Sequence, residues 1–210
     1  MKIFMGRQHT FYSYYLVAAC VAVFLLQLAF TPASMLDKDW FTYLFAVTPS
    51  LVLSQPWTLV TAMFMHGDWT HLFFNMFALY MFGPYLEYKI GGKRFLGLYF
   101  ATGIIGNAGY ALLSPSAFIP GLGASGAIYG VMGALAILEP NLEVYLFAIT
   151  PMPLWMVMFF WTLVSLWGTL SLAGGIGYSA HLAGVVAGGA YAYWLKKKNA
   201  KLLDSYGLDY

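Results

Sequence analysis

Residues 40–65, WFTYLFAVTPSLVLSQPWTLVTAMFM, form an uncharged stretch long enough to cross a bilayer as one helix, which takes about 20 apolar residues. Whether this stretch crosses decides the fold, because one span more or fewer reverses the direction of every helix after it. Pro49 and Pro56 interrupt the stretch, and a proline inside a helix removes a backbone hydrogen bond. Transmembrane helices nevertheless tolerate proline, so the segment by itself leaves the question open.

The composition of the whole chain indicates a membrane protein. Of its 210 residues 61% are hydrophobic and 9% are charged, whereas soluble domains carry about 25% charged residues. Six further apolar runs approach the length of a membrane span, and they cover residues 11–30, 69–88, 95–113, 122–138, 153–173 and 176–195. Because a bilayer offers no water to backbone N–H and C=O groups, each run is predicted to be a helix. The predicted fold class is all-α, a polytopic membrane protein.

The distribution of basic residues favours six spans over seven. Lys and Arg are in excess on the cytoplasmic side of membrane proteins. With six spans and a cytoplasmic N-terminus, nine basic residues lie inside and only Lys38 lies outside; a seventh span at 40–65 leaves two inside and eight outside. Residues 40–65 are therefore predicted to be a membrane-lying first outer loop, a depth that suits Trp40, Tyr43 and Trp57. Both termini are then expected in the cytoplasm.

The chain contains no polar linker, so residues 1–210 are predicted to form a single membrane-embedded domain. Its six-helix core covers about 11–196, followed by a basic cytoplasmic tail at 197–210. Cys20 is the only cysteine, which excludes an intramolecular disulfide. The run at 11–30 is longer than the core of a signal peptide, so we expect it to be retained. The short form without a leader suits a prokaryotic plasma membrane.

The second, fourth and sixth predicted spans all begin on the outer side, and each carries polar residues near its beginning. These residues are His66, His71 and Asn75 in HGDWTHLFFNM, Ser125 in GLGASG, and His181 in GYSAHLAG. Polar residues within spans are costly and usually face the protein interior or a water-filled cavity. A single Ser or Asn commonly serves only as a hydrogen bond between helices. A serine, histidines and an asparagine at one depth favour a functional site instead.

The residue types predict nucleophilic catalysis. Serine needs an adjacent base to become a nucleophile, and His181 is the candidate base for Ser125. Close approach of the two helices would bring this pair together, and G-x-x-x-G spacing permits such an approach. Each helix carries one such pair: Gly126 with Gly130, and Gly184 with Gly188.

Two further pairs of positions fit the same chemistry. Tyr129 lies four residues after Ser125 on the same helix face, so its ring could pack against the imidazole and orient it. An aspartate performs that task in a triad, but none lies at this depth, which favours a Ser–His dyad. His71 and Asn75 are also four apart, and both could donate to the oxyanion of a tetrahedral intermediate.

At these residues the sequence resembles the rhomboid family of intramembrane serine proteases, over about residues 11–196. Gly123, Ala124, Ser125 and Gly126 match the family's G-x-S-G, which implies Ser125 as nucleophile and the two glycines as support. Ala180 and His181 match the A-H-x-x-G of the sixth helix, which implies His181 as base.

The resemblance extends to the remaining polar positions. His71 and Asn75 match H-x-x-x-N, which implies that they line the oxyanion site, and His66 matches a further histidine that is not the base. Gly83, Glu87 and Gly91 match a structural G-x-x-x-E-x-x-x-G. Family members often carry Trp-Arg in the first loop. Here Thr58 follows Trp57, and that departure concerns the anchoring of the loop.

The resemblance implies a minimal six-helix serine endopeptidase that cleaves transmembrane segments near their outer end. Its expected partners are single-span or polytopic membrane-protein substrates and the lipid bilayer, with no nucleic acid, metal or cofactor. One alternative is a catalytically inactive rhomboid-like membrane chaperone or binding factor, which would be expected to lack the serine or the histidine.

Two other functions fit the sequence less well. A metal site could use His66, His71 and His181, but His66 and His71 are five apart and no H-E-x-x-H is present. A transporter or channel would need polar residues through the membrane, and the inner halves of these spans offer little beyond Asn107 and Glu87.

Overall fold

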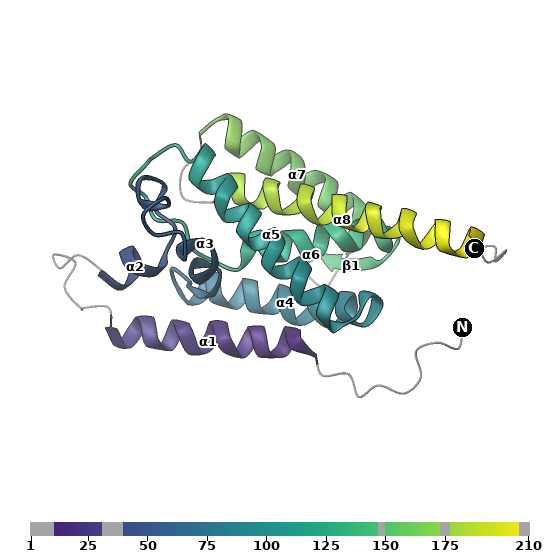
Figure 1. Ribbon diagram of the computed structural model, residues 1–210, viewed down its shortest axis with the longest axis horizontal. Coiled ribbons are helices and arrows are strands. Elements are labelled where there is room, and N and C mark those ends of the chain that lie inside the picture. The colour runs from purple at the N-terminus through teal and green to yellow at the C-terminus, as the bar shows by residue number, and fades with distance from the viewer. Residues whose placement is uncertain (1–10, 31–39, 147–149, 173–176, 206–210) are drawn as a thin grey trace.

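The computed structural model describes residues 11–30, 40–146, 150–172 and 177–205. Within these ranges six helices of 14 residues or more correspond to the six predicted apolar runs. They are α1 (Tyr12–Phe30), α4 (Trp69–Ile90), α5 (Gly92–Leu113), α6 (Ser125–Leu138), α7 (Leu154–Leu170) and α8 (Tyr178–Ser205). Figure 1 shows them alongside one another, with α1 at one edge and α7 at the opposite edge. The last helix continues into the region predicted as a tail, through Ser205.

By length and composition, α1 and α5 are the described helices that could each cross a membrane, while α6 and α7 are apolar but shorter. The chain is thus mostly helical, as the composition predicts. That it crosses the membrane six times stays a prediction.

The segment 40–65 does not form one continuous helix. It contains α2 (Trp40–Phe45), the 3-10 turn η1 (Pro49–Leu51), α3 (Thr58–Thr61) and the 3-10 turn η2 (Ala62–Phe64). A proline is the first residue of η1, where its missing N–H costs nothing. Four short pieces cannot cross a bilayer as a single helix. This agrees with the two sequence arguments against a seventh span, the prolines and the distribution of basic residues.

Hydrogen bonds hold this loop on the bundle. The Asn107 side chain of α5 donates to the Leu59 carbonyl at 2.9 Å, and the Trp57 indole N–H donates to Leu44 at 2.9 Å. Thr58, which follows Trp57, is buried, and its hydroxyl donates to the Gln55 carbonyl at 2.6 Å. The loop is therefore anchored through internal contacts.

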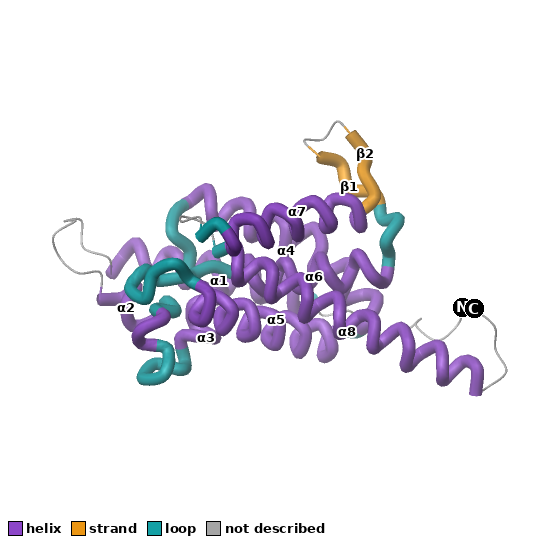
Figure 2. Tube along the Cα trace, turned by 90° about the horizontal axis from the view of Figure 1, so that it is seen from above, coloured by secondary structure: helices purple, strands orange, loops and turns teal. Residues whose placement is uncertain are grey.

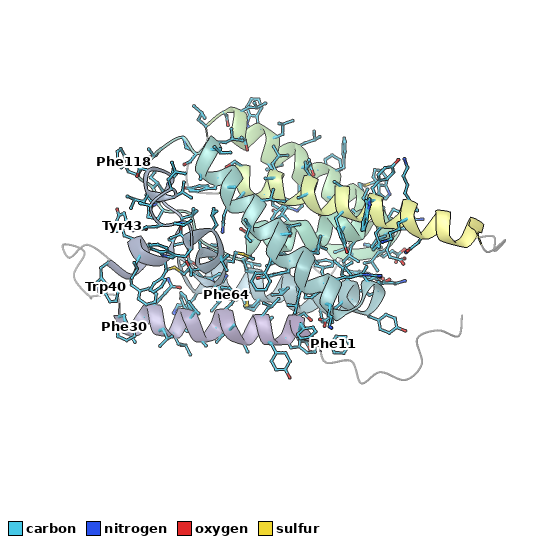
Figure 3. The ribbon with its side chains drawn as sticks, viewed as in Figure 1. Phe11, Phe30, Trp40, Tyr43, Phe64 and Phe118 are labelled. Atoms are coloured by element: carbon cyan, nitrogen blue, oxygen red, sulfur yellow. The ribbon has the colours of Figure 1, made fainter. Side chains whose placement is uncertain are left out.

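Exposed aromatic side chains lie near both ends of the helical bundle. Figure 3 shows Phe30, Trp40, Tyr43 and Phe118 at the end where α2 lies, while Phe11 lies at the opposite end of α1. Trp40 is 52% exposed and Phe118 is 74% exposed. Exposed aromatic rings of this kind are enriched at membrane–water interfaces.

The structure is mostly helical, and it also contains a short pair of strands that the all-α prediction did not include. Between α6 and α7 the chain forms an antiparallel hairpin of β1 (Glu143–Leu146) and β2 (Thr150–Pro153). Figure 2 shows this hairpin standing out from the helices. Its strands are only four residues long, too short for an alternating pattern to be distinguished from an apolar run.

The glycine pairs of α6 and α8 bring the two backbones into contact. A Cβ on Gly184 would collide with the backbone of Gly126, and one on Gly188 would collide with the backbone of Gly130. Without a hydrophobic driving force between helices in lipid, such close packing is a main source of association. The approach predicted from the G-x-x-x-G spacing is confirmed.

A buried carboxylate joins the end of α4 to the start of α1. Glu87 accepts hydrogen bonds from the backbone N–H of Tyr12 at 2.7 Å and from the N–H and hydroxyl of Ser13 at 3.0 Å each. The first N–H groups of a helix lack intrahelical partners and carry partial positive charge, so a carboxylate stabilises them. A Cβ on Gly83 would meet Ser13, which explains the small residue one turn before Glu87.

We therefore expect Glu87→Gln to lower the free energy of unfolding by about 2 kcal/mol, because one carboxylate oxygen becomes an NH₂ that cannot accept, so either the bond from Tyr12 or the bonds from Ser13 are lost. Unfolding by SDS in dodecyl maltoside micelles, followed by circular dichroism, measures this loss. The matched control is Glu139→Gln, which removes a surface ion pair with Lys89 and should cost about 1 kcal/mol or less. Equal losses for the two variants would contradict the role given to Glu87.

Candidate active site

The side chains of Ser125 and His181 lie within hydrogen-bond distance. Ser125 is the first residue of α6, and His181 lies in the first turn of α8. The distance from Ser125 Oγ to His181 Nε2 is 2.9 Å, and both residues are partly buried. A proton can pass directly between two atoms at this separation.

Backbone packing sets this distance. Gly126 follows Ser125 directly and lies against Ala180, the residue before His181, and against Gly106 of α5. Gly184, one turn after His181, lies against Gly126. The serine and the histidine are thus each within one turn of the point where the two helices touch.

The Tyr129 ring stacks on the His181 imidazole. The ring centroids are 4.2 Å apart and the planes differ by 5°. Trp161 of α7 meets the same tyrosine edge-on, with centroids 6.4 Å apart. The imidazole is therefore held on one face by a ring that is itself supported by a neighbouring helix.

His71 lies near Ser125, next to Gly123. Asp68 caps α4 by accepting from the His71 N–H at 2.8 Å, and the Gly67 N–H donates to His71 Nδ1 at 3.4 Å. With Nδ1 accepting, the neutral imidazole carries its proton on Nε2. A Cβ on Gly123 would lie 2.8 Å from His71 Nε2 and 3.7 Å from Ser125 Oγ. Both atoms therefore border the small space beside Gly123.

Gly123 itself has a φ of +127°, a conformation that side-chain-bearing residues rarely adopt. A side chain here would be strained and would also strike the His71 ring. The glycine is required by both the backbone and the space next to it.

Asn75 is buried one turn after His71, and its side-chain N–H donates to the His71 carbonyl at 3.0 Å. One N–H of the amide is therefore engaged within α4, and the other is available to a further acceptor. Among the described residues no hydrogen bond links Asn75 to Ser125 or His181.

His66 packs against the site without reaching the serine. Its ring centroid is 5.2 Å from that of His71, and burial lowers the pKa of His66 to about 4, so the ring is neutral at pH 7. Gln27 of α1 holds its backbone, donating to the His66 carbonyl at 3.1 Å and accepting from its N–H at 3.0 Å. The sequence analysis did not identify Gln27, although it is a polar residue within the apolar run 11–30.

Within the described ranges no three His, Cys, Asp or Glu side chains are grouped so that they could hold a metal ion. The geometry at the site is that of a serine, a base and nearby hydrogen-bond donors.

Comparison with known proteins identifies the class. The sequence matches the Rhomboid domain over residues 53–198, which is more than half of the chain. It is 43% identical over 77 residues to the putative rhomboid protease YdcA of Bacillus subtilis (strain 168), covering 37% of this chain and 38% of the relative. It is 33% identical over 147 residues to the mitochondrial rhomboid protein 1 of Saccharomyces cerevisiae, covering 67% of this chain and 42% of the relative.

The rhomboid protease GluP of Bacillus subtilis is 43% identical over 79 residues, covering 38% of this chain and 15% of the relative. The chain belongs to the rhomboid family, as its motifs predict, and that family implies an integral, polytopic membrane fold. The matched regions span less than half the length of each of these three relatives.

Proposed function

We propose that this protein is an intramembrane serine endopeptidase that cuts transmembrane segments near their outer end. The observation that carries the proposal is the 2.9 Å separation of Ser125 Oγ and His181 Nε2 at the start of two helices in contact. Relatives named as rhomboid proteases support the same activity.

In the proposed reaction His181 Nε2 takes the proton from Ser125 as Oγ attacks the scissile carbonyl carbon. The new C–O bond turns the carbonyl oxygen into an oxyanion. The C–N bond then breaks, and His181 returns its proton to the leaving amine. Water, deprotonated by the same imidazole, then adds to the acyl carbon. The C–O bond to Ser125 breaks, and the imidazole returns the proton to Oγ. Stacking on Tyr129 keeps the ring in position through these proton transfers.

The oxyanion would be stabilised by donors beside Gly123. His71 Nε2–H is one, because its other ring nitrogen already accepts from Gly67. The N–H groups in the first turn of α6 are others, since they have no intrahelical partner. The free N–H of Asn75 would complete the set. Donors aimed at developing negative charge are worth several kcal/mol when they are fixed beforehand.

The same proposal makes residues 40–65 an outer loop and places the basic ends of α5 and α8 in the cytoplasm. It follows from the excess of Lys and Arg at the end of the molecule where α8 terminates. Substrates would then approach Ser125 from the outer leaflet.

We expect purified protein to react covalently with a fluorophosphonate probe at Ser125, detected by in-gel fluorescence and peptide mass spectrometry. Ser125→Ala should abolish labelling. Ser165→Ala, which removes another buried serine hydroxyl on α7, is the matched control and should keep it. Labelling of Ser125→Ala would overturn the assignment of the nucleophile, and an unreactive wild type would favour an inactive membrane chaperone.

Asn75→Ala should lower turnover of a cleaved substrate by about 10²–10³, the usual effect of losing one oxyanion donor. Its stability should change little, because the bond that Asn75 makes lies within its own helix. Parallel measurement of turnover and SDS unfolding separates these effects. A collapse of stability that accounts for the lost activity would assign Asn75 a structural role only.

The substrate prediction follows from backbone chemistry. The carbonyls of a helical segment are already hydrogen-bonded, so cleavage requires local unwinding, which glycine and proline make less costly. The small space beside Gly123 further favours a small residue before the cut bond. Replacing the helix-breakers of a single-span substrate with leucine should slow cleavage in proteoliposomes, whereas EDTA should not. Equal cleavage of the leucine variant, or an EDTA loss restored by zinc, would disprove this mechanism.

A further inference from the structure

A groove of about 310 Å³ runs along the surface of the bundle between α5 and α8, away from Ser125 and His181. Gly97, Ala101 and Ile105 line it from α5, and Ala187 and Tyr191 line it from α8, with Arg94 at one end. The proposed protease function uses none of these residues. Figure 1 shows α5 and α8 close together near the start of α8 and diverging toward its end.

The groove is hollow because small residues of α5 face outward. Gly97 and Ala101 are exposed, and a Cβ on Gly97 would meet no atom within 4 Å. The hydroxyl of Thr102 on its wall already donates to the Leu98 carbonyl at 2.8 Å. The walls therefore present an apolar surface that would be in contact with lipid.

Its length corresponds to one leaflet. From Arg94 to Ile105 an α-helix rises about 16 Å, which is about half of the ~30 Å hydrocarbon core. One end of the groove would thus lie at a membrane surface and the other near the middle of the bilayer. An extended lipid acyl chain also reaches from the membrane surface to the middle of the bilayer, so it would fit along a groove of this length.

Positive charge lies only at the surface end. Arg94 is exposed and makes no ion pair among the described side chains. On α8 the face that carries Tyr191 continues to Trp194, with ring centroids 5.8 Å apart, and the Lys198 ammonium lies 5.1 Å from the Trp194 ring centroid. The Arg94 end of the apolar groove is therefore bordered by positively charged and aromatic side chains.

We propose that this groove binds an anionic phospholipid, with one acyl chain along Gly97 and Ala101 and the phosphate on Arg94. Basic pockets between membrane helices recognise anionic headgroups in this way. A second copy of the chain fits less well, because a symmetric contact through α5 would bring two Arg94 side chains of like charge together.

The test uses the full chain, freed of lipid in a mild detergent and titrated with palmitoyl-oleoyl phosphatidylglycerol or phosphatidylcholine. Native mass spectrometry counts the lipids bound. We expect one saturable phosphatidylglycerol site with at least about fivefold weaker binding of phosphatidylcholine. Arg94→Gln should remove this preference, while Lys93→Gln, an adjacent exposed cation outside the groove lining, should retain it.

A second pair of variants tests the groove by changing its volume. Gly97→Leu should weaken phosphatidylglycerol binding about tenfold or more without unfolding, because leucine favours helix and meets open space. Gly97→Ala, which raises helix propensity but fills little volume, should bind as the wild type does. Equal binding by all variants, no preference between the two lipids, or a change of oligomeric state in Gly97→Leu with lipid binding intact would overturn the proposal. None of these readouts depends on proteolysis.

Discussion

The geometry of the site depends on backbone-to-backbone contact between α6 and α8. At Gly184 and Gly188 of α8 there is no room for even one Cβ, because it would collide with the backbones of Gly126 and Gly130 of α6. Ser125 and His181 lie within a turn of the first contact, so any separation of the two helices acts directly on the 2.9 Å distance between Oγ and Nε2. In lipid no hydrophobic effect draws helices together, so this fit of surfaces maintains the distance.

Polar bonds hold the other half of the site. Near one end α1 is attached to α4 through Glu87 and Ser13, and near its other end Gln27 holds the backbone of His66 just before α4. Two attachments near opposite ends of one helix resist both sliding and tilting of α4. Because His71 belongs to α4, its position relative to Ser125 depends on bonds as far away as the opposite end of the bundle. Polar groups whose hydrogen bonds are made within the protein cost less free energy inside a membrane than unpaired ones do.

Much of this arrangement was predictable from sequence, and the exceptions have physical reasons. Uncharged runs predict helices because lipid leaves the backbone no other choice. The prolines argue against one straight helix at 40–65, and the count of basic residues argues against a span there. The nearness of Ser125 and His181 follows from depth and glycine spacing. The hydrogen bond between Gln27 and His66 could not be predicted, because a contact between residues 39 apart leaves no periodic pattern in the sequence. The hairpin at 143–153 was missed because four-residue strands carry too few alternations.

For glycine, the sequence alone does not show what the missing side chain does at each position. At Gly184 the missing side chain lets two backbones touch; at Gly123 it permits a φ of +127° beside the His71 ring; at Gly97 it leaves open space. Gly97 and Ala101 have the same small-x-x-x-small spacing as the pairs that join α6 to α8, yet none of the residues that the structure describes places an atom within 4 Å of a Cβ on Gly97. The spacing shows only that another surface can approach closely. The surface that meets Gly184 is the backbone of Gly126, whereas the positive charge of Arg94 near Gly97 favours the acyl chain and phosphate of an anionic phospholipid.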